Sequence, residues 1–301
     1  MLKKFFTLAS LLFLAAPTAS ALQMPQNVDE LLFGSNFTAQ SYVVMDNATG
    51  QVLFSKNEQK LWPPASLTKL VTAMVFLDTK PNMNKVVIMK KTDEVGGVRL
   101  STKSGVSYRL KDLFSAALIA SANNAATAVA RSTGLTPEEF VAKMNQKARD
   151  LGATNTLFLE PTGMSERNVT TASDFAKIVK AAYALAPIRA SASLNTYNFG
   201  STNNKRYYHK LKNTNKLLQD SELATAVGKT GYLDESRYNF AAEIQDRLGN
   251  DLIIVLLGSQ DSAAQFKETK ELAFLGSLAK SFFSPLANIF GTSTLGTTIN
   301  N

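Results

Sequence analysis

Residues 64–70 have the sequence Pro64-Ala65-Ser66-Leu67-Thr68-Lys69-Leu70, and this stretch decides how the rest of the chain is interpreted. It completes a Pro63-Pro64 break and opens an apolar pattern that predicts a helix over 66–77. Ser66 is therefore expected at a helix N-terminus, where backbone N–H groups and the helix dipole favour developing negative charge. A spacing of three residues places Lys69 one turn away on the same helical face.

Strand-like segments lie on both sides of this stretch and of the helical region that follows it. Alternating residues around turns at 46–50 and 247–250 predict two hairpins, with strands at 41–45, 51–55, 239–245 and 252–257. Between them, helices are predicted at 110–119, 124–131, 137–152 and 171–182. This order predicts an α+β fold in which both ends of the chain build one antiparallel sheet around a mostly helical insertion.

A closing helix is predicted over about 265–283. Only Lys280 is charged from Leu272 onward, which is a poor match for anionic lipid headgroups. Packing onto the sheet is therefore favoured over an alternative role as a membrane-surface anchor.

Two further short motifs follow in order, Ser121-Ala122-Asn123 and Lys229-Thr230-Gly231. Neither is specific alone, because Ser201-Thr202-Asn203 and Lys103-Ser104-Gly105 have similar patterns, and Ser277-Leu278-Ala279-Lys280 repeats the spacing of Ser66 and Lys69. Order and context distinguish the three motifs from these copies. Ser121 is expected to follow a helix, and the Lys229 motif is expected to begin a strand whose glycine leaves room for a substrate backbone.

The three motifs together predict nucleophilic catalysis by a serine. The Ser66 hydroxyl needs a base within hydrogen-bond reach, and Lys69 can serve only if its pKa is lowered. Burial and a neighbouring cation lower the pKa of an amine, and Lys229 is the candidate cation.

The remaining motif residues are expected to assist this step. Ser121 would relay a proton to the leaving amine, and Asn123 would orient Lys69 and hold a substrate amide. The backbone N–H groups of Ser66 and Tyr232 would form an oxyanion hole. Lys229, Thr230 and Gly231 would bind the substrate.

Composition excludes several other kinds of site. The chain has no cysteine and a single histidine, His209. A metal centre, a haem or a Ser-His-Asp triad is therefore not expected, and no cofactor is predicted. Basic residues are scattered without an aromatic-interleaved stripe, so nucleic-acid binding is not expected. The positive charge is interpreted as surface charge that favours an anionic polymer.

The first 21 residues are predicted to be a cleaved secretory signal. Lys3 and Lys4 precede the apolar run 5–16, and Ala19-Ser20-Ala21 fits the small-x-small cleavage pattern. Export would leave a mature chain from Leu22 with a net charge of about +6, since 30 of the 32 basic residues remain against 24 acidic ones. An uncleaved membrane anchor is the less favoured alternative.

The motifs resemble those of the serine penicillin-binding protein and β-lactamase superfamily. Segments 64–70, 121–126 and 227–232 are similar to the low-molecular-mass D-Ala-D-Ala peptidases. Segments 160–164 and 168–172 resemble more closely the D-alanyl-D-alanine endopeptidases of the penicillin-binding protein 7 type. This resemblance implies a five-stranded antiparallel sheet flanked by helices, a periplasmic location, peptidoglycan peptide stems as substrate, and covalent inhibition by β-lactam antibiotics.

The resemblance also implies one catalytic domain over 22–301. Its sheet-containing lobe would span about 22–90 and 195–301, and its helical lobe about 91–194. Only 70 residues follow Gly231, which leaves no room for the additional domain and membrane anchor of some carboxypeptidases. We therefore expect an endopeptidase that hydrolyses cross-links, with no integral membrane anchor after signal cleavage.

Three alternatives remain open at this point. A D-Ala-D-Ala carboxypeptidase would use the same residues. A β-lactamase would need a deacylating carboxylate, for which Glu160 is a superficial match. A catalytically inactive penicillin-sensing or wall-binding protein could share the fold. His209 and Trp62 are expected to be packing residues, and Asn213-Thr214-Asn215 is expected near the rim of the site.

Overall fold

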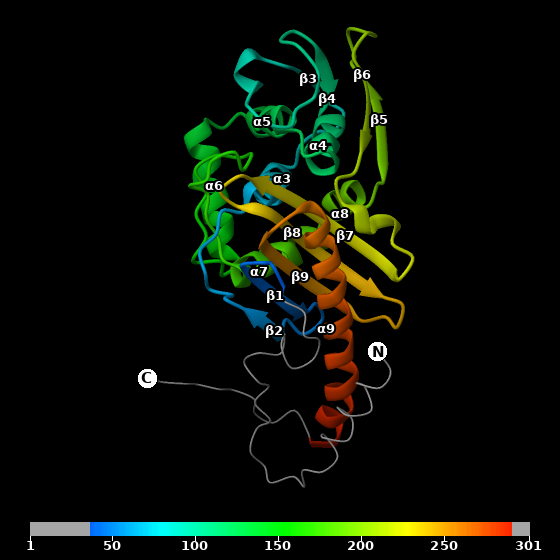
Figure 1. Ribbon diagram of the computed structural model, residues 1–301. Coiled ribbons are helices and arrows are strands. Elements are labelled where there is room, and N and C mark those ends of the chain that lie inside the picture. Colours follow the sequence, from blue (N-terminus) through cyan, green and yellow to red (C-terminus); the bar gives the residue numbers. More distant parts are fainter. Residues whose placement is uncertain (1–36, 291–301) are drawn as a thin grey trace. The chain divides into compact units, whose positions relative to one another are not determined.

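A five-stranded antiparallel sheet is the centre of the fold (Figure 1). The computed structural model describes residues 37–290. The strand order is β2-β1-β9-β8-β7, with bounds β1 (Ser41–Asp46), β2 (Val52–Lys56), β7 (Leu223–Leu233), β8 (Arg237–Asp246) and β9 (Asp251–Ser259). Because β1 pairs with β9, segments from both ends of the described chain join in one sheet. The predicted α+β class and the predicted assembly of the sheet are confirmed.

The two predicted hairpins form at turns that their own acidic residues stabilise. In the β1–β2 turn, Asp46 Oδ1 accepts hydrogen bonds from the backbone N–H and the hydroxyl of Thr49, at 2.7 and 3.0 Å. In the β8–β9 turn, Asp246 Oδ1 accepts from Leu248 N and Asn250 N, both at 2.8 Å. Such side-chain acceptors satisfy turn N–H groups that have no strand partner.

Helix α9 (Ser262–Phe290) covers one face of the sheet (Figure 1). A Cβ added at Gly276 would lie 2.7 Å from Leu252 Cδ1, so the helix backbone is close against β9. Lys280 Nζ forms an ion pair with Asp46 at 2.5 Å. The packing role predicted for the closing helix is confirmed, and the helix is longer at both ends than predicted.

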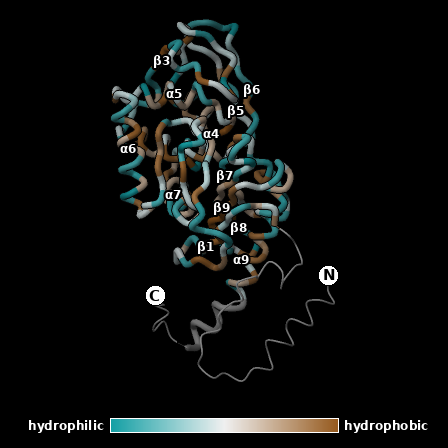
Figure 2. The backbone as a smooth tube through the Cα atoms, turned by 60° about the vertical axis from the view of Figure 1, so that its left-hand side comes forward, coloured by the Kyte–Doolittle hydropathy of each residue, from teal (hydrophilic) through white to brown (hydrophobic). Residues whose placement is uncertain are grey.

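The other face of the sheet packs against helices. Alternate residues of β9, Ile253, Val255 and Leu257, join the main hydrophobic core together with Phe175 and Ile178 of α7. This alternation is the two-residue period of a strand buried on both faces, and Figure 2 shows the hydrophobic segments that result. The helices are α3 (Lys69–Asp78), α4 (Leu110–Ile119), α5 (Asn123–Ser132), α6 (Pro137–Asp150), α7 (Ala172–Ala184) and α8 (Ala186–Ala192).

The structure differs from the predicted elements in three places. The helix predicted from residue 66 begins as a 3₁₀ turn, η1 (Ala65–Thr68), before α3. Lys229 lies in the middle of β7 and does not begin it. Two small hairpins were also missed because their strands are short and largely polar: β3 (Val86–Ile88) with β4 (Ser107–Arg109), and β5 (Thr196–Gly200) with β6 (Tyr208–Lys212).

Helix α8 and the short 3₁₀ turns η2 (Lys91–Asp93) and η3 (Lys216–Gln219) were not predicted either. The predicted signal sequence 1–21 lies outside the described residues. The division into two lobes stays a prediction. No helix among residues 37–290 is both long enough and apolar enough to cross a membrane.

Candidate active site

The turn that carries Ser66 is held from several sides. Asn239 Nδ2 of β8 donates to Pro63 O at 2.9 Å, and Ala65 has a φ of +49°. A Cβ added at Gly231 of β7 would lie 2.7 Å from Pro64 O and 3.2 Å from Ser66 N. The edge strand of the sheet therefore runs directly beside the serine. The space beside Gly231 is thus filled by the Ser66 turn of the protein itself, and its predicted room for a substrate backbone stays a prediction.

Lys69 is buried below this turn, with its amine at the serine hydroxyl. Its Nζ lies 2.8 Å from Ser66 Oγ and donates to Thr162 O at 2.6 Å, and the residue is 1% exposed. Burial holds the pKa of Lys69 well below its ordinary value, and the charge of Lys229 lowers it further, whereas Glu160 opposes the shift. A neutral amine next to a hydroxyl can accept its proton.

Ser121 and Lys229 form a second hydroxyl–amine pair. Ser121 lies between α4 and α5 with a φ of +59°, which turns the chain between the two helices. Lys229 Nζ donates to Ser121 Oγ at 2.9 Å and to Thr230 O at 2.8 Å. Burial lowers the pKa of Lys229 to about 7. The amine can therefore carry charge near neutral pH and still respond to its surroundings.

The neighbouring residues of β7 differ in exposure. Thr230 Oγ1 donates to Thr214 Oγ1 at 2.7 Å, so the segment predicted at the rim does reach the Lys229 motif. Tyr232 follows with its side chain 49% exposed, and its hydroxyl donates to Asp234 at 2.6 Å. The Tyr232 side chain is thus engaged at the surface, and the predicted role of its backbone N–H stays a prediction.

Asn123 makes contacts different from the predicted ones. Its Nδ2 donates to Gly96 O at 2.7 Å, and its backbone N donates to Val98 O. Its buried Oδ1 has no hydrogen-bond partner. The predicted contact with Lys69 is therefore not formed. Asn123 instead fixes the loop before Leu100, and its predicted contact with a substrate amide stays a prediction.

Glu160 stabilises the loop that supplies the second partner of Lys69. Its carboxylate accepts from Thr162 N at 2.7 Å, from Gly163 N at 2.6 Å and from Asn168 Nδ2 at 3.0 Å. Gly163 has a φ of +84°, and a Cβ there would lie 1.9 Å from Ala65 O. The carboxylate is thus engaged by the loop, which does not favour a role as a deacylating base.

Sequence reasoning missed Thr162 and Thr214 as direct partners of the motif residues. Thr162 contributes its carbonyl, which any residue could supply, so no side-chain pattern marks it. Thr214 had a weak signal, because it lies within the Asn213-Thr214-Asn215 segment predicted at the rim.

Trp62 and His209, which were expected to be packing residues, both contact neighbouring groups of the protein. Trp62 Nε1 donates to Ser236 O at 2.9 Å. His209 is buried, with Nε2 2.9 Å from the hydroxyl of Tyr108, and burial lowers its pKa. Residues 37–290 contain no cluster of His, Cys, Asp or Glu that could hold a metal ion.

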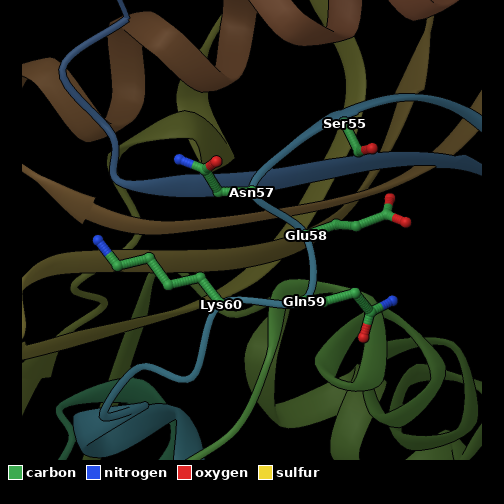
Figure 3. A pocket seen from close by; sticks show the side chains of 5 residues that line it. All are labelled: Ser55, Asn57, Glu58, Gln59 and Lys60. Atoms are coloured by element: carbon green, nitrogen blue, oxygen red, sulfur yellow. The ribbon is translucent and has the colours of Figure 1, made fainter.

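A separate open hollow lies at the end of β2 (Figure 3). Its side chains are Ser55, Asn57, Glu58, Gln59 and Lys60. It contains none of the motif residues and no paired nucleophile and base. The motif cluster is therefore the candidate active site.

The sequence profile of the family described as D-alanyl-D-alanine carboxypeptidase matches residues 26–261. The chain belongs to this family. Members of the D-alanyl-D-alanine carboxypeptidase family are serine DD-peptidases, and the three motifs of this chain lie within the matched residues. The predicted family membership and enzyme class are thereby confirmed.

Individual relatives agree with the family. A D-alanyl-D-alanine endopeptidase of Haemophilus influenzae is 35% identical over 235 residues, which cover 77% of this chain and 80% of the relative. One from Pseudomonas aeruginosa is 34% identical over 230 residues, covering 75% and 73%. A solved variant of the Streptomyces K15 DD-transpeptidase is 25% identical with a TM-score of 0.75, covering 81% of this chain and 99% of that one. The predicted fold family is confirmed.

Proposed function

We propose that this chain is a DD-endopeptidase that hydrolyses the D-alanyl cross-links of peptidoglycan through an acyl-enzyme on Ser66. The observation that carries the proposal is the buried Lys69 amine, 2.8 Å from Ser66 Oγ and with a lowered pKa. The relatives named as D-alanyl-D-alanine endopeptidases support the choice of an endopeptidase.

The acylation step follows from these positions. Ser66 Oγ attacks the D-Ala carbonyl carbon while neutral Lys69 accepts the hydroxyl proton, with Thr162 O holding the amine in place. The carbonyl oxygen becomes an oxyanion, which the backbone N–H groups of Ser66 and Tyr232 stabilise. Ser121 then gives its hydroxyl proton to the leaving amine and takes from Lys69 the proton that came from Ser66, and the carbon–nitrogen bond breaks as the carbonyl re-forms.

The leaving amine distinguishes the two peptidase activities. In an endopeptidase it is the side-chain amine of the cross-linking diamino acid, and in a carboxypeptidase it is a terminal D-Ala. In both, cationic Lys229 and the Thr230 hydroxyl bind the carboxylate next to the scissile bond. Asn123 Oδ1 accepts from a substrate amide. Water then hydrolyses the acyl-enzyme, and a penicillin would be trapped at the same stage.

The chain is expected to act outside the cytoplasm, in the periplasm, after removal of residues 1–21. The family's cell-wall peptidases support this location, and the substrate occurs only there.

Digestion of defined muropeptides tests the function. The full chain without its signal is incubated with a cross-linked dimer and with a pentapeptide monomer, and products are measured by mass spectrometry. We expect the dimer to be split, and the Ser66→Ala variant to be inactive. Intact dimers with wild-type protein would exclude the endopeptidase, and loss of only the terminal D-Ala would establish a carboxypeptidase instead.

A further inference from the structure

The β5–β6 hairpin has two chemically different faces. Register pairs Phe199 with His209 on the inner face, and both side chains are buried. The outer face carries Tyr208, Lys210 and Lys212 at every second position of β6, all exposed. We call these three residues the β6 row. Successive members are about 7 Å apart along an extended strand, so the two ammonium groups present a regularly spaced positive charge.

The β6 row is not neutralised by nearby acidic residues. The chain has no Asp or Glu between Arg189 and Asp220. Asp112, which packs against the hairpin, accepts a hydrogen bond from Tyr197 on the inner face. Within residues 37–290 no ion pair involves Lys210 or Lys212. Both cations are therefore available to an external anion.

The β6 row leads into the candidate active site. Two residues after Lys212, Thr214 contacts Thr230 beside Lys229. Asn213 fixes this junction, because its Nδ2 donates to Ala192 O and to Leu194 O at 3.0 and 2.9 Å. A polymer whose peptide lies in the active site can therefore extend along β6 without leaving the surface.

We propose that the β6 row binds the free carboxylates of the cross-linked peptidoglycan strand whose peptide is being cleaved. This inference rests on the proposed function and specifies how polymeric substrate is preferred over small peptides. Stem peptides carry free carboxylates, so their charge complements the two lysines, and the exposed Tyr208 ring offers an apolar surface for the intervening polymer. The continuity of the row with the active site favours the substrate polymer over an anionic membrane.

Binding to intact sacculi tests the proposal without cleavage. The Ser66→Ala protein is compared with the same protein carrying Lys210→Glu and Lys212→Glu. The control carries Lys143→Glu and Lys267→Glu, which change net charge equally at exposed helix positions on α6 and α9. Melting curves by circular dichroism confirm that all three fold. We expect the β6 variant to bind about tenfold more weakly at low salt and the control to bind like the parent.

The same binding measurement tests whether the carboxylates of the peptidoglycan are the groups that the β6 row binds. Sacculi whose carboxylates have been amidated should bind parent and β6 variant equally. Equal binding of β6 variant and control to untreated sacculi would overturn the proposal. Binding to vesicles of anionic phospholipid is measured alongside. If the β6 substitutions weaken binding to these vesicles but not to sacculi, the proposal is also overturned, since that result assigns the row to a membrane.

Turnover separates this proposal from the proposed function. With Ser66 present, the β6 substitutions should lower the ratio of sacculus digestion to cleavage of a small soluble dimer by about tenfold. An unchanged ratio contradicts the role of the row while leaving the endopeptidase intact. If wild-type protein cleaves neither substrate, the proposed function fails, and the sacculus-binding result still decides the role of the row.

Discussion

Lys69 and Lys229 are two buried amines, each hydrogen-bonded to a serine hydroxyl. Both have lowered pKa values because burial disfavours the charged ammonium form. They are not equivalent, since the charge of Lys229 contributes to the shift at Lys69. The two amines can therefore take different protonation states near neutral pH, with Lys69 as a neutral base and Lys229 as a cation.

The pH dependence of acylation tests this division. The proposed mechanism needs neutral Lys69, so the rate of reaction with a fluorescent penicillin should fall as pH decreases through the Lys69 pKa. Below pH 7 Lys229 is charged and opposes protonation of Lys69. Replacing it by Lys229→Gln removes that opposition, raises the Lys69 pKa, and should move the acidic limb to higher pH.

Lys229→Arg is the control, because it keeps a cation at this position and should leave the acidic limb nearer to that of the wild type. In the wild type the rate should also decline above about pH 7, where Lys229 loses its charge. An acidic limb that stays in place in Lys229→Gln would contradict the coupling between the two amines.

At the scale of elements, the site depends on the loop after α6 that contacts the Ser66 turn. Gly163 and Gly134 have nearly the same φ, +84° and +85°, but only Gly163 has backbone atoms where a Cβ would be. Gly163→Ala should therefore displace Ala65 and Ser66 and reduce penicillin acylation at least tenfold. Gly134→Ala should cost only backbone strain, about 1 kcal/mol, without a change in acylation. Equal effects of the two substitutions on acylation would contradict this account.

Glu160 provides a second prediction for the same loop. Glu160→Gln removes an acceptor from several loop N–H groups, so it should lower the free energy of unfolding by about 2 kcal/mol and slow acylation. A β-lactamase base would behave differently, because its loss would selectively lengthen the life of the acyl-enzyme. Stopped-flow acylation, acyl-enzyme decay and urea unfolding measured on one preparation distinguish the two roles.

The sequence predicted some elements well because their signals are local. The helix 110–119 was placed at its observed bounds, and Thr136 as N-cap with Pro137 at the first helical position marked the start of α6. The β5–β6 hairpin was missed because its strands are short and largely polar, and the packing of Phe199 and His209 against Tyr108, which buries one face, joins segments far apart in the chain. Because this hairpin was not predicted, Lys210 and Lys212 were interpreted as part of the scattered surface charge.

The same difference holds within the site. Ser66 and Lys69 were predictable because they share one turn of chain, and the Lys229 motif because its residues are adjacent. The Ser121–Lys229 contact joins positions 108 residues apart and was not predicted. The loss of the predicted Asn123–Lys69 contact reflects competition from Gly96 O, which belongs to a loop that sequence alone could not place.

At the scale of the whole molecule, one ion pair joins the helical region to the sheet. Arg189 of α8 binds both oxygens of Glu243 on β8 at 2.6 Å. The Glu243 side chain is 8% exposed and that of Arg189 is 40% exposed. Arg189→Met should lower the free energy of unfolding by roughly 2 kcal/mol, because a nearly buried carboxylate loses its partner while solvent reaches part of the pair.

Adding Glu243→Leu to that variant should restore most of the loss, since the uncompensated charge is then gone. Urea unfolding of the two single variants and the double variant gives the coupling energy. If the losses of unfolding free energy in the two single variants simply add up in the double variant, the ion pair does not stabilise the contact between α8 and the sheet.

The arrangement around Ser66 also has a consequence for the order of events in folding. The groups that complete the site come from chain segments near residues 66, 121, 163 and 231, and such long-range contacts form late in folding because long loops must close first. Partly folded chains should have helices before they have a reactive serine. A serine DD-peptidase built in this way would thus stay inactive until the last stage of folding, and penicillin labelling during refolding should lag behind the recovery of helical circular dichroism.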